Sequence, residues 1–162
     1  MKIRIVYISV LLLSVFFMSG CSDRVLNVTQ RPMPTLDKNR ATTITLFTLK
    51  NYTDTPRAGM RAANIIEGVL YAKGYIVHYV KKSDEFKKSE LQKYQSDYYM
   101  TGAVSEWRYK TGIDGEPAVS FRLALYDSKT NRLVWSGVGS DNDWGNASIG
   151  TTAQALIEDM LK

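Results

Sequence analysis

Two carboxylates in one short loop are the first residues whose types could do chemistry. Asp114 and Glu116 stand in the segment GIDGEP at 112–117. A glycosidase pair flanks its substrate across about 5–9 Å, which two positions on one loop reach only with a fixed backbone. Asp-Gly and Glu-Pro also favour a bend, so turn formation explains the same residues. The alternative is an exposed acidic patch that oligomerisation could repeat. The residues disfavour a hydrolase and leave the other two interpretations open.

The other candidates for catalysis or ligand binding are isolated. His78, the single histidine, lies between Val77 and Tyr79, in an expected strand that favours a structural or surface role over that of a base. One cysteine and one histidine cannot build a Cys/His zinc site. DND at 141–143 resembles the start of a calcium loop without its later glutamate, and GVG at 137–139 lacks the third glycine of a dinucleotide site. We expect no enzymatic activity, no cofactor and no metal.

The single cysteine has a different chemistry, lipid attachment. Lys2 and Arg4 precede a thirteen-residue apolar run at 5–17, which has the length of a signal-peptide core and is too short to span a bilayer. MSGC at 18–21 is similar to a bacterial lipobox, with Met18 where leucine is preferred. This predicts a signal peptide at 1–20 and acylation of Cys21 by diacylglycerol and an amide-linked chain such as palmitate. The alternative is an uncleaved anchor with a chance cysteine.

Removal of the signal peptide changes the charge of the chain. The formal net charge of +5 over 162 residues falls to +3 when Lys2 and Arg4 are lost. The basic balance then no longer points to nucleic acid, and we expect no nucleic-acid partner. Ser22 rather than aspartate follows Cys21, which by resemblance to other Gram-negative lipoproteins favours the periplasmic face of the outer membrane.

The mature chain divides into a polar segment and one folded domain. Residues 21–40 contain Pro32 and Pro34 and show no apolar period, which predicts a lipidated, flexible tether. Residues 41–162 predict an α/β (α+β) domain with the order βαβαβββα and a mixed sheet of about five strands covered by helices. The first helix is expected to start at Thr55-Pro56, as N-cap and first helical residue, and to close at Lys73-Gly74. The expected strands are about 42–49, 75–80, 98–109, 118–126 and 132–138, and the other helices are 83–94 and about 147–161.

The three tryptophans fall into two groups. Trp107 and Trp135 lie within expected strands, where core or subunit-interface positions are expected. Trp144 lies in the polar segment 140–146. In a lipid-anchored protein its ring could rest among lipid headgroups, or it could fold back onto the sheet.

Several segments of the chain form a characteristic set. They are the lipobox, NYTDTPRAG at 51–59, GAVSEWRYKTGIDGEPAV at 102–119, LVWS at 133–136 and Trp144. Together they resemble the PelC family, the outer-membrane lipoproteins of Pel exopolysaccharide export. The resemblance covers most of the mature chain, although the tether and the lysine-rich helix add nothing to it. Its most specific part runs from EWRY at 106–109 to EP at 116–117.

The resemblance implies a non-enzymatic role in biofilm polymer export. PelC-like proteins assemble as a dodecameric ring in the periplasm around the mouth of a β-barrel porin, PelB. An electronegative funnel would guide a cationic polysaccharide to that porin, since a ring of like charges focuses the field in its mouth. Asp114 matches the acidic position, Glu116 is a nearby candidate, and Trp144 matches the membrane-facing tryptophan. The alternative is a tethered lipoprotein that activates a peptidoglycan synthase.

Overall fold

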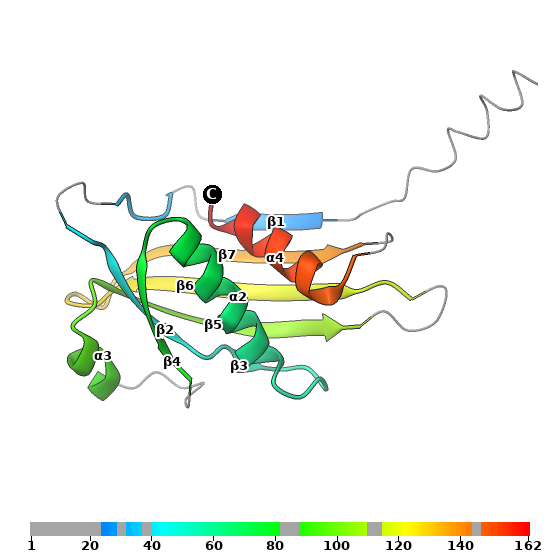
Figure 1. The fold of residues 1–162 in the computed structure, drawn as a ribbon, viewed down its shortest axis with the longest axis horizontal. Coiled ribbons are helices and arrows are strands. Elements are labelled where there is room, and N and C mark those ends of the chain that lie inside the picture. The colour runs from blue at the N-terminus through cyan, green and yellow to red at the C-terminus, as the bar shows by residue number, and fades with distance from the viewer. Residues whose placement is uncertain (1–23, 29–31, 37–39, 82–87, 110–114, 144–146) are drawn as a thin grey trace, which may run out of the picture.

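Seven strands form one mixed sheet, in which β1-β7-β6-β5-β2-β4 pair in that order and β3 pairs with β5 (Figure 1). The computed structural model describes residues 24–28, 32–36, 40–81, 88–109, 115–143 and 147–162. The strands are β1 (Arg24–Val28), β2 (Thr43–Phe47), β3 (Lys50–Asn51), β4 (Ile76–Val80), β5 (Tyr98–Arg108), β6 (Ala118–Asp127) and β7 (Leu133–Asn142). The described helices are α2 (Ala58–Ala72), α3 (Lys88–Tyr94) and α4 (Ile149–Met160).

The sheet has a parallel half and an antiparallel half. β2 runs parallel to both β4 and β5, and helices α2 and α3 make the crossovers that parallel strands require. β5, β6 and β7 form an antiparallel meander, and β1 adds to its edge against β7. The predicted fold class and the predicted order of elements from β2 onward are confirmed, apart from the two-residue β3.

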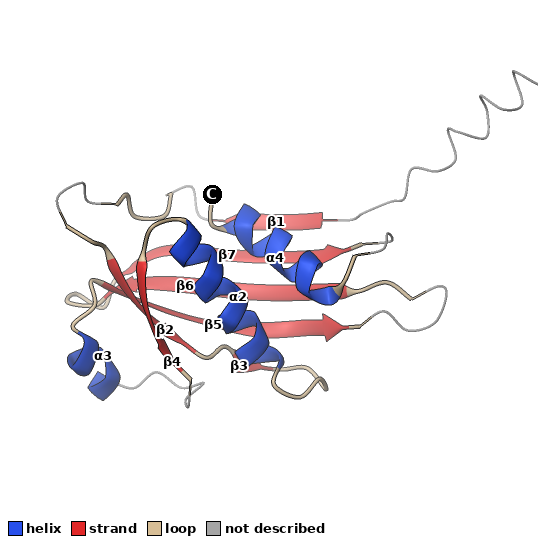
Figure 2. Cartoon of the chain, in the orientation of Figure 1, coloured by secondary structure: helices blue, strands red, loops and turns tan. Residues whose placement is uncertain are grey.

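Helices α2 and α4 pack on the same face of the sheet (Figure 2). Strand β6 shows why: Phe121, Leu123 and Leu125 alternate toward this face and are buried. A second, smaller cluster on the opposite face contains Phe47 and Tyr99, and Leu91 of α3 packs against it. The sheet is therefore covered by two helices on one face and by a short helix at one end of the other.

The segment expected to be a tether contributes to the domain. Arg24–Val28 forms β1, whose five residues pair with Gly137–Asp141 of β7. Met33 is 7% exposed and belongs to the main core, and the Tyr75 hydroxyl donates to the Pro34 carbonyl at 2.6 Å. The sequence prediction of a flexible segment up to residue 40 was wrong for these stretches, because their partners lie far away in the sequence.

The start of α2 also differs from the prediction. The helix begins at Ala58, and Arg57 occupies the N-cap position with φ 62° and makes no side-chain capping bond. The Thr55 hydroxyl instead donates to the Trp107 carbonyl at 2.7 Å, which ties the loop to β5. The predicted end is confirmed, since Lys73 is the C-cap and Gly74 follows at φ 92°.

None of the described helices is long and apolar enough to cross a membrane.

Candidate functional site

One end of the sheet gathers the chain segments that lead to the predicted site residues (Figure 1). Arg24, at the start of β1, pairs in register with Asp141 near the end of β7. Ala118, at the start of β6, pairs with both Asn142 and Arg108. The start of β1, the β5–β6 connection and the exit from β7 therefore share one end of the sheet, which we call the anchor end.

Three of the four predicted site residues lie outside the described residues. They are Cys21, Asp114 and Trp144. Their covalent neighbours are informative nonetheless. Asp114 directly precedes Gly115, Trp144 directly follows Asp143, and Cys21 is three residues before Arg24, at most about 11 Å of extended chain. All three join the described chain at the anchor end.

Glu116 lies within the described residues, and its side chain is hydrogen-bonded within the domain. Its side chain is half-buried, and its Oε1 accepts a hydrogen bond from Asn142 Nδ2 at 3.3 Å. Its Oε2 is buried and has no partner among the described residues. The bond joins the Glu116 side chain to the last residue of β7. A buried carboxylate oxygen without a partner is costly, so this group is poorly placed to act as an open surface charge.

Arg24 ties the anchor end together, a role that the sequence did not predict. Its Nε and Nη2 donate to Asp141 Oδ2 at 2.9 and 2.5 Å, and its Nη1 donates to Asp159 of α4. The Asp141 side chain is only 2% exposed. The hydrogen bond to Asp141 is the main reason that the pKa of Arg24 is raised. The hydrogen bond from Lys162 and the charge of Lys162 lower the pKa of Asp159, and the charge of Arg24 lowers it further.

Charges of both signs lie at the described part of this end. Arg108 Nε lies 3.4 Å from Glu106 Oε1, and both side chains are largely exposed. Asp143 is half-buried, and its backbone N–H donates to the Pro117 carbonyl at 3.3 Å, joining the exit of β7 to the entry of β6. Hydrogen bonds and strand pairing therefore hold the described strand ends together at the anchor end.

The arrangement does not resemble a catalytic centre in the described part of the chain. His78 stacks on Tyr94 with ring centroids 4.9 Å apart, a packing role like the one predicted. Across the described ranges no three His, Cys, Asp or Glu side chains could hold a metal ion. Trp107 and Trp135 are buried core residues, one of the two positions expected for them.

Two solved structures resemble this chain over almost its whole length. A PelC dodecamer from Paraburkholderia phytofirmans has a TM-score of 0.75 and 31% sequence identity, covering 86% of this chain and 95% of that one. A variant of the PelC dodecamer from the same organism has a TM-score of 0.73 and 32% identity, covering 85% and 96%. No protein-family model and no curated protein matches the sequence.

A more distant structure shares the fold. Lipoprotein GNA1162 from Neisseria meningitidis has a TM-score of 0.51 and 21% identity, covering 66% of this chain and 86% of that one. At this identity the likeness concerns the arrangement of helices and strands alone.

Proposed function

This chain belongs to the PelC family, and from that membership we propose that it is a non-enzymatic lipoprotein of Pel exopolysaccharide export. It is anchored through Cys21 at the periplasmic face of the outer membrane and assembles into a ring of identical copies. The ring guides a cationic polysaccharide to a PelB-like β-barrel porin. The observation that carries the proposal is 31% identity over 86% of the chain to a protein solved as a dodecamer.

The position of the anchor end supports this arrangement. Only two residues lie between Cys21 and Arg24, the first residue of β1, so an acylated Cys21 keeps the anchor end within about 11 Å of the lipid attachment point. Asp114 and Trp144 are each joined to the described chain at the same end. A tryptophan ring near lipid headgroups and an acidic loop near the porin mouth fit that placement.

The charge of the funnel rests mainly on Asp114. Glu116 bonds Asn142 and is half-buried, so we assign it a smaller share of the field and a part in fixing the loop that carries Asp114. Twelve copies of one carboxylate around a narrow, low-dielectric mouth raise the local concentration of a cationic polymer. The net charge of +3 on the mature chain is compatible with this role if the acids line the mouth and the basic groups lie elsewhere.

Polymer secretion by cells that carry variant chains tests the proposal. Asp114→Asn keeps the size of the side chain and removes its charge, so we expect secreted polymer to fall while protein level and ring mass stay unchanged. Glu158→Gln is the matched control, because Glu158 is an exposed acid on α4 that bonds Gln154. Equal secretion by Asp114→Asn and wild type would refute the guiding role of Asp114.

The alternative of a peptidoglycan-synthase activator is not favoured. Such an activator needs a long tether to reach its enzyme, whereas β1 begins three residues after Cys21 and Met33 is buried in the core. Capture of a cell-wall synthase by a monomeric form of this protein would restore that alternative.

A further inference from the structure

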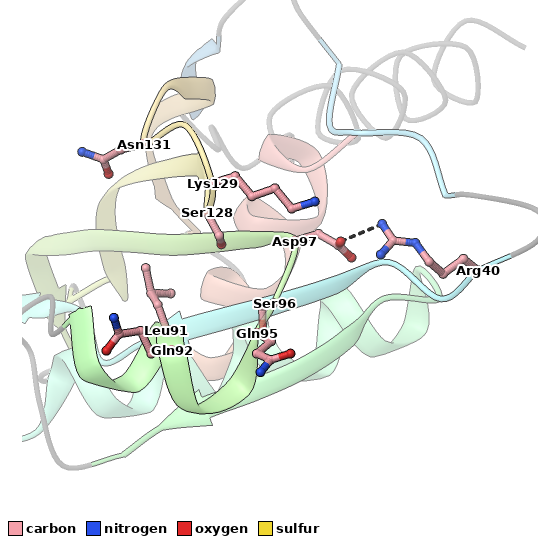
Figure 3. Close-up of a pocket in the computed structure, with 9 residues that line it drawn as sticks. All are labelled: Arg40, Leu91, Gln92, Gln95, Ser96, Asp97, Ser128, Lys129 and Asn131. Carbon is pink, nitrogen blue, oxygen red and sulfur yellow. Dashed lines mark hydrogen bonds and ion pairs between the residues drawn. The ribbon is translucent and has the colours of Figure 1, made fainter.

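A polar cavity lies at the opposite end of the sheet from the anchor end. It has a volume of about 620 Å³ and lies between the end of α3, the β6–β7 hairpin and Arg40 (Figure 3). The register pair Tyr98 and Asp127 marks this end of β5 and β6, and the pair Arg108 and Ala118 marks the anchor end. Ten residues of extended strand separate the two, about 33 Å. A site here faces away from the lipid attachment point.

The carboxylate of the cavity is already used by the protein. Asp97 Oδ1 accepts from Arg40 Nη2 at 2.6 Å, and its Oδ2 accepts from Thr43 N and Oγ1, both at 2.9 Å. Its side chain is 13% exposed. Asp97 therefore fixes the wall of the cavity and offers no free anion to a ligand, while Lys129 adds a positive charge.

Neutral amides and hydroxyls supply the remaining chemistry. Gln92, Gln95 and Asn131 line the cavity. The Gln92 and Gln95 side chains are exposed, whereas Asn131 Oδ1 already accepts a hydrogen bond from the Tyr99 hydroxyl. Ser128 Oγ is buried and lacks a partner among the described residues, so a side-chain rotation could offer it to a ligand. The Gln92 and Gln95 amides each carry a donor and an acceptor, and Asn131 adds its Nδ2 donor, which matches the hydroxyl and acetamido groups of a sugar.

Two of these amides sit on unfavourable backbone positions. Gln95 has φ 48° and Asn131 has φ 57°, and Arg57 is the third described non-glycine residue with positive φ. Glycine adopts this region without steric cost, and asparagine tolerates it better than glutamine does. Gln95 directly follows the end of α3, and its backbone N–H donates to the Leu91 carbonyl. Glycine would make the same hydrogen bond equally well. A glutamine at this backbone position is explained if its side chain binds a ligand.

We propose that this cavity binds a neutral acetamido sugar. The neutral amides pair with its hydroxyls and its acetamido group, and Leu91 offers an apolar contact for the acetyl methyl. Among the described residues that line the cavity, an ammonium sugar finds no free carboxylate and meets the charge of Lys129. The site is separate from the acidic loop at the anchor end and does not rest on the proposed function. The same sugar chemistry occurs in acetylated units of an exported polymer and in the glycan of the cell wall.

Saturation-transfer NMR with the purified, lipidated protein in detergent tests the proposal, since the method suits large assemblies. The probes are the trisaccharide of N-acetylglucosamine, its fully deacetylated form at pH 6, and the cell-wall disaccharide that contains N-acetylmuramic acid. We expect transfer to the acetylated trisaccharide and its acetyl methyl, and little or none to the deacetylated form. Equal or stronger transfer to the deacetylated form, or no transfer to any probe, would overturn the proposal.

Matched glycine variants locate the binding in the cavity. Gln95→Gly relieves the backbone and removes one amide, so we expect affinity to fall about fivefold, the loss of one neutral hydrogen bond, without a lower melting temperature. Arg57→Gly relieves the same kind of backbone strain outside the cavity and should leave affinity unchanged. Equal affinity in Gln95→Gly and wild type would place the binding elsewhere and contradict the inference. If the Gln95→Gly variant locates binding in the cavity, the two acetylated probes distinguish the natural ligand. Stronger transfer to the trisaccharide identifies it as the exported polymer, and stronger transfer to the muramic disaccharide identifies it as the glycan of the cell wall.

Discussion

Arg24 Nε lies 2.9 Å from Asp141 Oδ2, across 117 positions of the sequence. The pair joins the first residue of β1, the edge strand of the sheet, to the neighbouring strand β7. Because Arg24 also binds Asp159 of α4, one guanidinium holds the edge strand, its neighbour and a helix together. Cys21, the proposed lipid attachment residue, precedes this contact by three positions in the sequence.

Removal of Arg24 should destabilise the domain strongly. Arg24→Ala leaves the Asp141 carboxylate, whose side chain is 2% exposed, without its cation, so we expect a loss of about 3 kcal/mol. Arg40→Ala is the control, because Arg40 is 66% exposed in its pair with Asp97 and should cost at most about 1 kcal/mol. Urea unfolding at one protomer concentration measures both. Similar losses in the two variants would show that the Arg24 pair has no special role.

The free energy of unfolding should fall at acid pH, in part because Asp97 becomes protonated. Burial alone raises the pKa of this carboxyl, but hydrogen bonds from Thr43 and the contact with Arg40 outweigh it and lower the pKa below its ordinary value of 3.8. A lowered pKa stabilises the fold above the ordinary value, and that stabilisation is lost as the pH falls through the folded-state pKa. Asp97→Asn should therefore flatten the dependence of unfolding free energy on pH below about pH 5. A variant with the same slope as wild type would exclude Asp97 as a source of the acid sensitivity.

Two glycines on α2 should respond in opposite directions to alanine. A Cβ at Gly59 would lie 1.9 Å from the Leu49 carbonyl oxygen, whereas a Cβ at Gly68 meets nothing within 4 Å. Gly59→Ala should force the helix away from the chain between β2 and β3 and cost about 2 kcal/mol. Gly68→Ala should stabilise the helix by about 1 kcal/mol. Thermal unfolding of both variants checks the close approach of α2, and a stabilised Gly59→Ala would contradict it.

Membrane attachment should depend on Cys21 and sorting on Ser22. Cys21→Ala removes the thiol that carries the lipid, so we expect the protein to leave the outer-membrane fraction. Inhibition of lipoprotein signal peptidase should leave a larger precursor. Ser22→Asp keeps the thiol and should retain the lipoprotein in the inner membrane, which separates sorting from acylation. Unchanged fractionation of Cys21→Ala and no precursor on inhibition would refute the lipobox prediction.

Periodicity predicted the elements whose apolar residues pack within the domain. Residues 118–126 alternate, and Phe121 and Leu123 of β6 are buried as that alternation requires. β7 was predicted to end at Val138 yet continues to Asn142. Its glycines conceal the strand in the sequence, but a Cβ at Gly139 would lie 2.8 Å from Leu156 of α4. The glycine permits the close approach of this helix, which only the tertiary structure reveals.

Local sequence could not predict contacts made by distant polar groups. RVLNV at 24–28 is five residues long, and all five are exposed in the structure, so no buried face marked it as a strand. The Arg24–Asp141 pair and the Thr55 bond to the Trp107 carbonyl span 117 and 52 positions. Glu116 was chosen for its charge, whereas its bond to Asn142 depends on the pairing of β6 with β7. Contacts between residues far apart in the sequence therefore could not be predicted from local periodicity, and the prediction of function depended on the family resemblance.

The mass of the assembled protein tests the central claim most directly. Sedimentation and native mass spectrometry of the lipidated chain in detergent, and of the Cys21→Ala form without detergent, measure the number of copies. Membership of the PelC family, with a member from Paraburkholderia phytofirmans solved as a dodecamer, predicts closed rings of twelve chains in both preparations. A protein that stays monomeric in both at high concentration would contradict the account.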